Sequence, residues 1–196
     1  MTFIETVPEA EARSPVAEMY EADRTAYGQV ANFTKAFSLR PDVYAAWRQL
    51  NLAIRGSMDR RRYELATLAA ARRLRSSYCM LAHGSVLADK FLEADAVRAI
   101  VADHRTAGLD PTDTAVMDLA DKVAVDATYV SSADVERLRS LGLSDRDIFD
   151  VVAAAAARCF FSKVLDGLGT QPDTKYADLD PQLRSALTVG RPLADP

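Results

Sequence analysis

Long alanine-rich stretches with helical periodicity constrain this chain more than any other feature. Apolar side chains recur on nearly every turn of residues 59–74 and 148–168, and the second stretch includes five consecutive alanines at positions 153–157. Alanine is the best helix former, and 34 of the 196 residues are alanine, whereas glycine and proline number eight each. Because a helix with so little polar surface is usually buried, the sequence predicts an all-α protein with the 59–74 helix at its centre.

Helix start and stop signals divide the chain into a bundle of about eight helices. A serine followed three residues later by an aspartate, as at Ser144 and Asp147, is typical of a capped helix start. We expect a single domain over residues 1–170 that includes an N-terminal extension, and an irregular tail over 171–196 because that segment contains four prolines. The expected helices cover residues 15–28, 32–39, 41–56, 59–74, 76–101, 111–125, 132–142 and 148–168.

Composition and charge exclude several classes of protein. The formal net charge of −4 argues against a nucleic-acid partner, which requires a basic face. Two cysteines and two histidines are too few for a disulfide scaffold or a zinc cage, so we expect no metal. The sequence has no Gly-rich phosphate loop and no dinucleotide-binding fingerprint, and we expect no cofactor. The longest apolar run, residues 151–157, is far shorter than the ~20 residues that span a bilayer. Together with the absence of a targeting signal, these features predict a cytoplasmic protein without a membrane partner.

The break between the fourth and fifth expected helices places reactive side chains close together. Cys79 and His83 are four residues apart, so they share one face of a helix. If Ser76 is the N-cap, its hydroxyl can accept a hydrogen bond from the Cys79 backbone N–H, and the thiol then lies at the positive end of the helix dipole. A helix N-terminus and a neighbouring imidazole both favour the thiolate, which is the nucleophilic form of cysteine.

Two further side chains belong to the same candidate site. Glu64 lies on the preceding apolar helix, where a carboxylate needs a partner that His83 or Tyr78 could supply. Tyr78 could also donate its hydroxyl to the site, although a tyrosine at a helix start often serves only in packing. Without further information, Cys79 and His83 also fit a passive role, since buried cysteine commonly behaves as a small apolar residue.

The segment from Glu64 to His83 resembles the signature of the alkylhydroperoxidase AhpD-like group within the carboxymuconolactone decarboxylase superfamily. In that signature a glutamate is followed after twelve residues by a cysteine, after three more by a second cysteine, and after four more by a histidine. Glu64, Cys79 and His83 match it, whereas Ser76 stands in place of the first cysteine. The resemblance extends over about residues 15–170, and the longer chain is similar to the uncharacterised peroxidase-related subgroup.

This resemblance implies an all-helical AhpD-like fold that assembles into a homo-trimer or homo-hexamer. It also implies a peroxidase mechanism in which Cys79 attacks a hydroperoxide, with His83 as the base and Glu64 as the proton relay. Ser76 cannot resolve the resulting sulfenic acid, because a hydroxyl forms no disulfide. Cys159 lies in an apolar context typical of a core, so we expect an external thiol or a reductant protein to replace the missing cysteine.

Three functions are therefore open at the sequence level. The first is a thiol-dependent, peroxidase-related oxidoreductase with antioxidant activity towards hydrogen peroxide or organic hydroperoxides. The second is a decarboxylase-like acid/base enzyme that uses Glu64 and His83 on a lactone-like substrate, with Cys79 only lining the pocket. The third is a degenerate, non-enzymatic oligomer that senses redox state.

Overall fold

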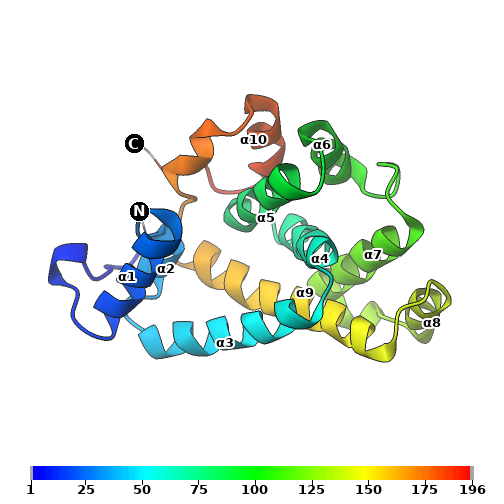
Figure 1. The fold of residues 1–196 in the computed structure, drawn as a ribbon, viewed down its shortest axis with the longest axis horizontal. Coiled ribbons are helices and arrows are strands. Elements are labelled where there is room, and N and C mark those ends of the chain that lie inside the picture. The colour runs from blue at the N-terminus through cyan, green and yellow to red at the C-terminus, as the bar shows by residue number, and fades with distance from the viewer. Residues whose placement is uncertain (1, 195–196) are drawn as a thin grey trace.

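The computed structural model describes residues 2–194, and these residues form ten α-helices, three short 3-10 helices and no strand (Figure 1). The prediction of an all-α protein is confirmed. The α-helices are α1 (Val16–Tyr27), α2 (Asn32–Ala36), α3 (Pro41–Ser57), α4 (Arg60–Arg73), α5 (Ser77–Lys90), α6 (Ala94–Asp103), α7 (Pro111–Asp126), α8 (Ser132–Ser140), α9 (Asp145–Gly167) and α10 (Pro181–Leu187), and the 3-10 helices are η1 (Glu9–Glu11), η2 (Ala127–Tyr129) and η3 (Thr174–Asp178).

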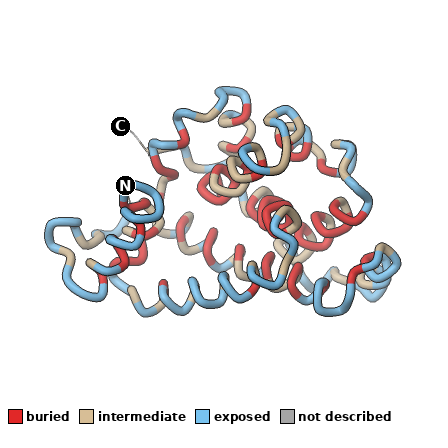
Figure 2. The backbone as a smooth tube through the Cα atoms, viewed as in Figure 1, coloured by how far each residue is buried: buried red, intermediate tan, exposed pale blue. Residues whose placement is uncertain are grey.

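Helix α4 forms the centre of the molecule, as its sequence predicts. Nine consecutive residues, Tyr63–Ala71, are buried, so α4 is enclosed around its whole circumference (Figure 2). It packs against α5, α7 and α9. Small side chains on α4, Ala66 and Ala69–Ala71, allow the neighbouring helices to approach closely, and Tyr63, Leu65 and Leu68 fill the space between them.

The long helix α9 lies beside α3 along one edge of the molecule (Figure 1). Its start has the expected capping box, in which Ser144 and Asp147 bond each other's backbone N–H groups. Helix α3 begins at Pro41, a residue suited to a first helical position. Together α3, α5 and α9 form most of the wall around the candidate site described below.

The structure differs from the sequence prediction in two places. The helix expected over 76–101 is two helices, α5 and α6, because the Phe91 and Leu92 N–H groups both donate to the Leu87 carbonyl and end the first one. The tail expected to be irregular contains η3 and α10, and α10 packs on α5 and α6. Within the described residues, no helix is both long and apolar enough to cross a membrane.

Arginines at both ends of α4 form ion pairs with α7. Arg61 and Arg62 both contact the buried Asp113 on α7, and the Arg62 Nε–Asp113 distance is 3.1 Å. At the other end of α4, the Arg73 Nε lies 2.5 Å from Asp121. These pairs fix α4 against α7 and leave Arg60, at the start of α4, to face the candidate site.

Candidate functional site

The break between α4 and α5 positions the candidate nucleophile. Arg75 adopts a left-handed backbone conformation with φ of 55°, which turns the chain, and Ser76 precedes α5 in an extended conformation. Cys79 is therefore the third residue of α5, as predicted. One part of the prediction is wrong: Ser76 is fully buried, but its hydroxyl makes no capping hydrogen bond.

The Cys79 thiol is buried and has two hydrogen-bond donors from α9. The Ser162 hydroxyl lies 3.1 Å from the Cys79 Sγ, and the Arg158 Nη1 lies 3.5 Å from it. Cys79 is only 1% exposed, so bulk water contributes little to its environment. Two donors aimed at one sulfur atom stabilise a negative charge on it.

Arg158 is a functional candidate that the sequence reasoning missed. It is 4% exposed, and in the described residues no carboxylate lies within ion-pairing distance of it. Burial works against its charge, yet its contacts with Cys79 and Tyr63 hold the pKa of Arg158 above the ordinary value. A buried cation needs a compensating anion, and Cys79 is the ionisable group that its Nη1 touches. The sequence did contain one feature that could have identified Arg158, because a charged residue directly follows five alanines there.

Glu64 and His83 meet, which the sequence could only suggest because they lie on different helices. The Glu64 Oε2 is 2.5 Å from the His83 Nδ1, and the Arg60 Nε donates to the other carboxylate oxygen at 3.0 Å. Burial opposes the charge on Glu64, but the contacts with His83 and then Arg60 lower the pKa of Glu64. Glu64 is therefore a carboxylate that accepts a hydrogen bond from His83.

His83 is neutral at neutral pH. Burial first, and the nearby charge of Arg158 second, lower the pKa of His83, although Glu64 opposes this shift. Since Glu64 accepts the Nδ1 proton, the neutral tautomer leaves Nε2 free as a proton acceptor. His83 and Cys79 share a face of α5 and line the same cavity, so that cavity contains both a base and a thiol.

The other sequence candidates lie close to this site but have different contacts. The Tyr78 hydroxyl donates to Asp173 and accepts the Phe33 N–H at 3.2 Å, so it joins α5 to α2 and to the tail. Burial raises the pKa of Tyr78 well above its ordinary value. Cys159 is half-buried on α9 and does not line the cavity that contains Cys79, and burial raises the pKa of Cys159.

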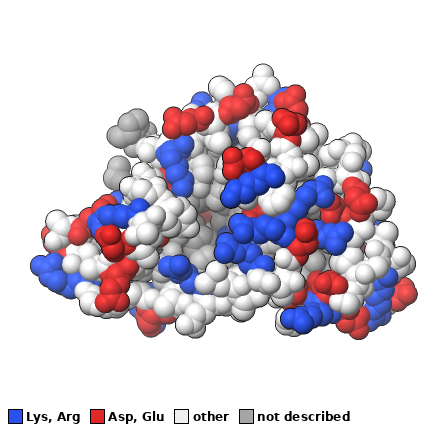
Figure 3. All heavy atoms as spheres, viewed as in Figure 1, with Lys and Arg blue, Asp and Glu red and all other residues white. Residues whose placement is uncertain are grey.

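Cys79 opens on a cavity of about 650 Å³ enclosed by α1, α2, α3, α4, α5, α9 and the tail. On the face viewed in Figure 3, Lys and Arg side chains gather beside a hollow near the middle of the molecule, among these same elements. Aromatic rings form much of the wall, and Trp47 stacks on Phe161 with ring centroids 4.0 Å apart. The residues that form aromatic walls are Tyr27, Phe33, Tyr44, Trp47, Tyr63, Tyr78, Phe161 and Tyr176.

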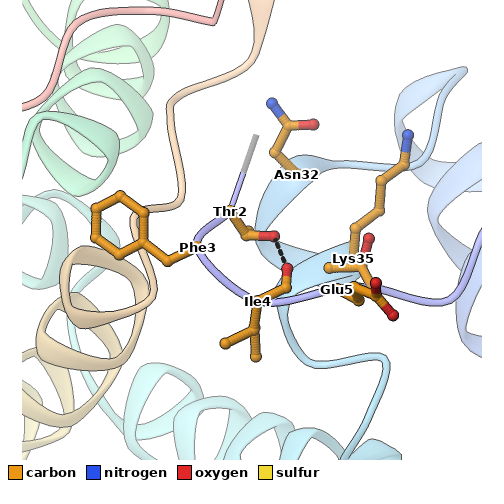
Figure 4. A pocket seen from close by; sticks show the side chains of 7 residues that line it. Thr2, Phe3, Ile4, Glu5, Asn32 and Lys35 are labelled. Atoms are coloured by element: carbon orange, nitrogen blue, oxygen red, sulfur yellow. Dashed lines mark hydrogen bonds between the residues drawn. The ribbon is translucent and has the colours of Figure 1, made fainter.

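A second, smaller cavity of about 370 Å³ lies under the N-terminal segment. It is lined by residues 2–6 with Asn32 and Lys35, and Figure 4 shows Phe3 pointing away from those two side chains. The Thr2 hydroxyl donates to the Ile4 carbonyl across a turn. This cavity shares no lining residue with the Cys79 cavity, and neither a thiol nor a histidine lines it.

In the described part of the chain, no cluster of His, Cys, Asp and Glu could hold a metal ion.

Comparison with solved structures identifies the fold. A protein from Ralstonia eutropha JMP134, described as an alkylhydroperoxidase AhpD core and uncharacterized peroxidase-related protein, superposes with a TM-score of 0.81 at 22% identity over 89% of this chain and 94% of that one. An uncharacterized peroxidase-related protein from Silicibacter sp. TM1040 superposes with a TM-score of 0.77 at 21% identity, over 90% of this chain and 91% of that one. The debrominase Bmp8, in a variant bound to 2,3,4-tribromopyrrole, superposes with a TM-score of 0.73 at 12% identity, over 95% of this chain and 96% of that one.

The helical bundle, with a buried cysteine and a glutamate–histidine pair around one cavity, has an AhpD-like fold. Residues 41–122, which include all three motif side chains, match the sequence model of the carboxymuconolactone decarboxylase family. The chain is similar to this family over residues 41–122, and its fold is similar to that of the AhpD-like and peroxidase-related proteins. No functionally curated protein matches the chain.

Proposed function

We propose that this protein is a thiol-dependent, peroxidase-like oxidoreductase that reduces hydrogen peroxide or an organic hydroperoxide through Cys79. The observation that carries the proposal is the Cys79 thiol held between Arg158 and Ser162, in the cavity that also exposes His83. A nucleophile, a neutral base and a cation that stabilises the thiolate are the groups that this chemistry needs.

The proposed reaction begins when His83 accepts the thiol proton of Cys79, while Glu64 holds the imidazole in the required tautomer. The thiolate attacks one peroxide oxygen, so that an S–O bond forms as the O–O bond breaks. Sulfur is oxidised to sulfenic acid, and the leaving oxygen takes the proton from His83 to give water or an alcohol. Arg158 stabilises the negative charge before the attack.

The sulfenic acid then requires an external thiol. Ser76 stands where the family has its first cysteine and cannot form a disulfide, and Cys159 does not line the Cys79 cavity. One external thiol condenses with the sulfenic acid to give a mixed disulfide and water. A second thiol attacks this disulfide, which restores Cys79 and releases the oxidised thiol pair.

The proposal is tested by exposing the protein to peroxide and trapping sulfenic acid with dimedone for mass spectrometry. We expect the adduct on Cys79, none in Cys79→Ser, and an unchanged yield in the matched variant Cys159→Ser. A Cys79 that remains a thiol while Cys159 or nothing reacts would contradict the proposal. Sulfenic acid that no small or protein thiol reduces would instead support a redox sensor.

The glutamate–histidine pair favours one alternative function, because its geometry is complete without Cys79. In that case His83 and Glu64 move protons in a decarboxylation or isomerisation of a lactone-like substrate, and Cys79 only lines the pocket. A Cys79→Ala protein that turns over such a substrate would favour the acid/base enzyme, and loss of turnover would count against it.

A further inference from the structure

The Cys79 cavity is much larger than hydrogen peroxide requires. A water molecule occupies about 30 Å³ in the liquid, and peroxide is only slightly larger, whereas the cavity measures about 650 Å³. Cavities of about 300–1,000 Å³ are typical of sites for organic small molecules. The shape and charge of the walls should therefore show which organic molecules fit.

The polarity of the wall changes along α3. Tyr44 and Trp47 come first on its cavity face, and Arg48, Asn51 and Arg55 follow at helical spacing. Helix α9 also presents an aromatic and a charged side chain to the cavity within one turn. Phe161 stacks on Trp47, and Arg158 contacts Cys79. A flat aromatic surface thus adjoins a polar, positively charged one.

Positive charge exceeds negative charge in this cavity, although the whole chain has a net charge of −4. The lining cations are Arg48, Arg55, Arg60, Lys90, Arg158 and Lys175, and the lining carboxylates are Asp23 and Glu64.

Both carboxylates already have partners. Burial raises the pKa of Asp23, which also accepts the Ala31 N–H at 3.0 Å, and Glu64 is bound to His83 and Arg60. In the described residues, Arg48, Arg55 and Lys90 form no ion pair. A cleft lined with charge of one sign concentrates ligands of the opposite sign.

We propose that the cavity binds an aryl carboxylate, with its ring against Trp47 and Phe161 and its carboxylate at the Arg48–Arg55 side of α3. For the reaction, this inference rests on the proposed function: the substrate is an aryl carboxylate that also carries a hydroperoxide group, which Cys79 reduces to the alcohol. The aromatic wall binds the ring by stacking, and the guanidinium groups bind the carboxylate through charge-assisted hydrogen bonds.

The single tryptophan of the chain, Trp47, reports binding directly because it lies in the wall. We would titrate the protein with 3-phenylpropanoate and with its uncharged analogue 3-phenylpropanamide, and follow Trp47 emission excited at long wavelength, where neither probe absorbs. Because one charge-assisted hydrogen bond changes affinity by about tenfold, we expect the carboxylate to bind about tenfold more tightly than the amide. Bound carboxylate should also slow alkylation of Cys79 by iodoacetamide.

Matched double variants test the position of the carboxylate. Arg48→Gln with Arg55→Gln should bring the affinity ratio of carboxylate to amide close to one. Arg146→Gln with Lys163→Gln changes the net charge equally outside the cavity and should leave the ratio unchanged. Equal affinity of the two probes for the unmodified protein, or an equal effect of the two double variants, would overturn the inference.

These titrations contain no peroxide, so their outcome is independent of the proposed function. Preferential binding of 3-phenylpropanoate without any sulfenic acid on Cys79 would reject the peroxidase and retain the ligand class. Sulfenic acid on Cys79 without preferential binding would reject the ligand class and retain the peroxidase.

Discussion

Arg158 is a buried cation that pairs with no carboxylate among residues 2–194, and its Nη1 contacts the Cys79 sulfur. A hydrogen bond to a charged group is worth about 1.5–3 kcal/mol, so Arg158→Met should slow alkylation of Cys79 at pH 7 by about tenfold or more. The measurement is made in a Cys159→Ser background, where Cys79 is the only thiol. Arg158→Lys should retain part of the rate.

The exposed α9 variant Lys163→Met serves as the control for this experiment, and its alkylation rate should be unchanged. Circular dichroism verifies that each variant is folded. If the Arg158→Met protein is folded and Cys79 is alkylated at the original rate, Arg158 does not contribute to the reactivity of Cys79.

The protonation of His83 provides a second prediction at the residue scale. Burial, followed by the charge of Arg158, lowers the pKa of His83 below its ordinary 6.5, and Glu64 works in the opposite direction. We therefore expect Glu64→Gln to lower this pKa further and Arg158→Met to raise it. The chain has two histidines, so proton NMR resolves two imidazoles, and His83→Gln assigns the signal.

The same shift determines how His83 affects stability with pH. The pKa of His83 is lower in the folded state than in the unfolded state. Its contribution to the free energy of unfolding is therefore fully present above pH 6.5 and is lost as the pH falls through the folded-state pKa. A His83 signal that titrates at or above 6.5, or that moves in the same direction in both variants, would contradict the assigned environment.

At the scale of elements, Tyr78 joins α5, α2 and the tail. Its hydroxyl donates to the buried Asp173 and accepts the Phe33 N–H. Tyr78→Phe leaves both groups without this partner, so we expect the free energy of unfolding to fall by about 1–3 kcal/mol, with the Cys79 alkylation rate nearly unchanged. Urea denaturation and alkylation kinetics measure the two effects.

Tyr176→Phe is the matched control, because the Tyr176 hydroxyl makes no hydrogen bond within the described structure, and its effect on stability should be smaller. If Tyr78→Phe instead slowed the reaction of Cys79 strongly at unchanged stability, the hydroxyl would belong to the chemistry of the site.

The tail contacts the break between α4 and α5 at Gly190. The Gly190 N–H donates to the Ser77 hydroxyl at 2.7 Å, and a Cβ at position 190 would lie 2.0 Å from the Arg75 carbonyl oxygen. Since that oxygen belongs to the backbone, Gly190→Ala forces the tail away, and we expect a destabilisation of about 1–3 kcal/mol.

Gly56→Ala is the opposite case, because a Cβ there meets no atom within 4 Å and the residue lies in α3. It should stabilise the protein by about 0.5–1 kcal/mol. Urea midpoints of the two variants should therefore move in opposite directions. Equal midpoints would mean that the tail does not pack on the break.

Elements with local signals were predictable from sequence, and those that depend on tertiary contacts were not. The Ser144–Asp147 cap and the start of α3 at Pro41 follow from local hydrogen bonding and backbone geometry. The end of α5 at Phe91 has no glycine or proline to mark it, so it results from packing. Similarly, the sequence placed Cys79 and His83 on one face, but Arg158 reaches Cys79 only because α9 packs beside α5.

At the scale of the whole molecule, α9 presents an apolar stripe to the outside. Phe149, Ala156 and Phe160 recur at helical spacing, and the two phenylalanines are 70% and 43% exposed. Exposed aromatic residues on a regular helix face are typical of protein–protein interfaces. The expected homo-trimer or homo-hexamer offers a partner for this stripe, a second copy of the chain.

We therefore predict that the protein elutes as a stable multiple of its 21.4 kDa chain mass in size-exclusion chromatography with light scattering. Phe149→Ser with Phe160→Ser should lower the measured mass, because the stripe loses its two large apolar contacts. Tyr129→Ser removes another aromatic side chain that is 70% exposed, outside α9, and should leave the mass unchanged. A protein that is monomeric at micromolar concentration, or a double variant of unchanged mass, would show that copies do not associate through α9. Because α9 also carries Arg158 and Ser162, association along this helix would restrain the donors of Cys79.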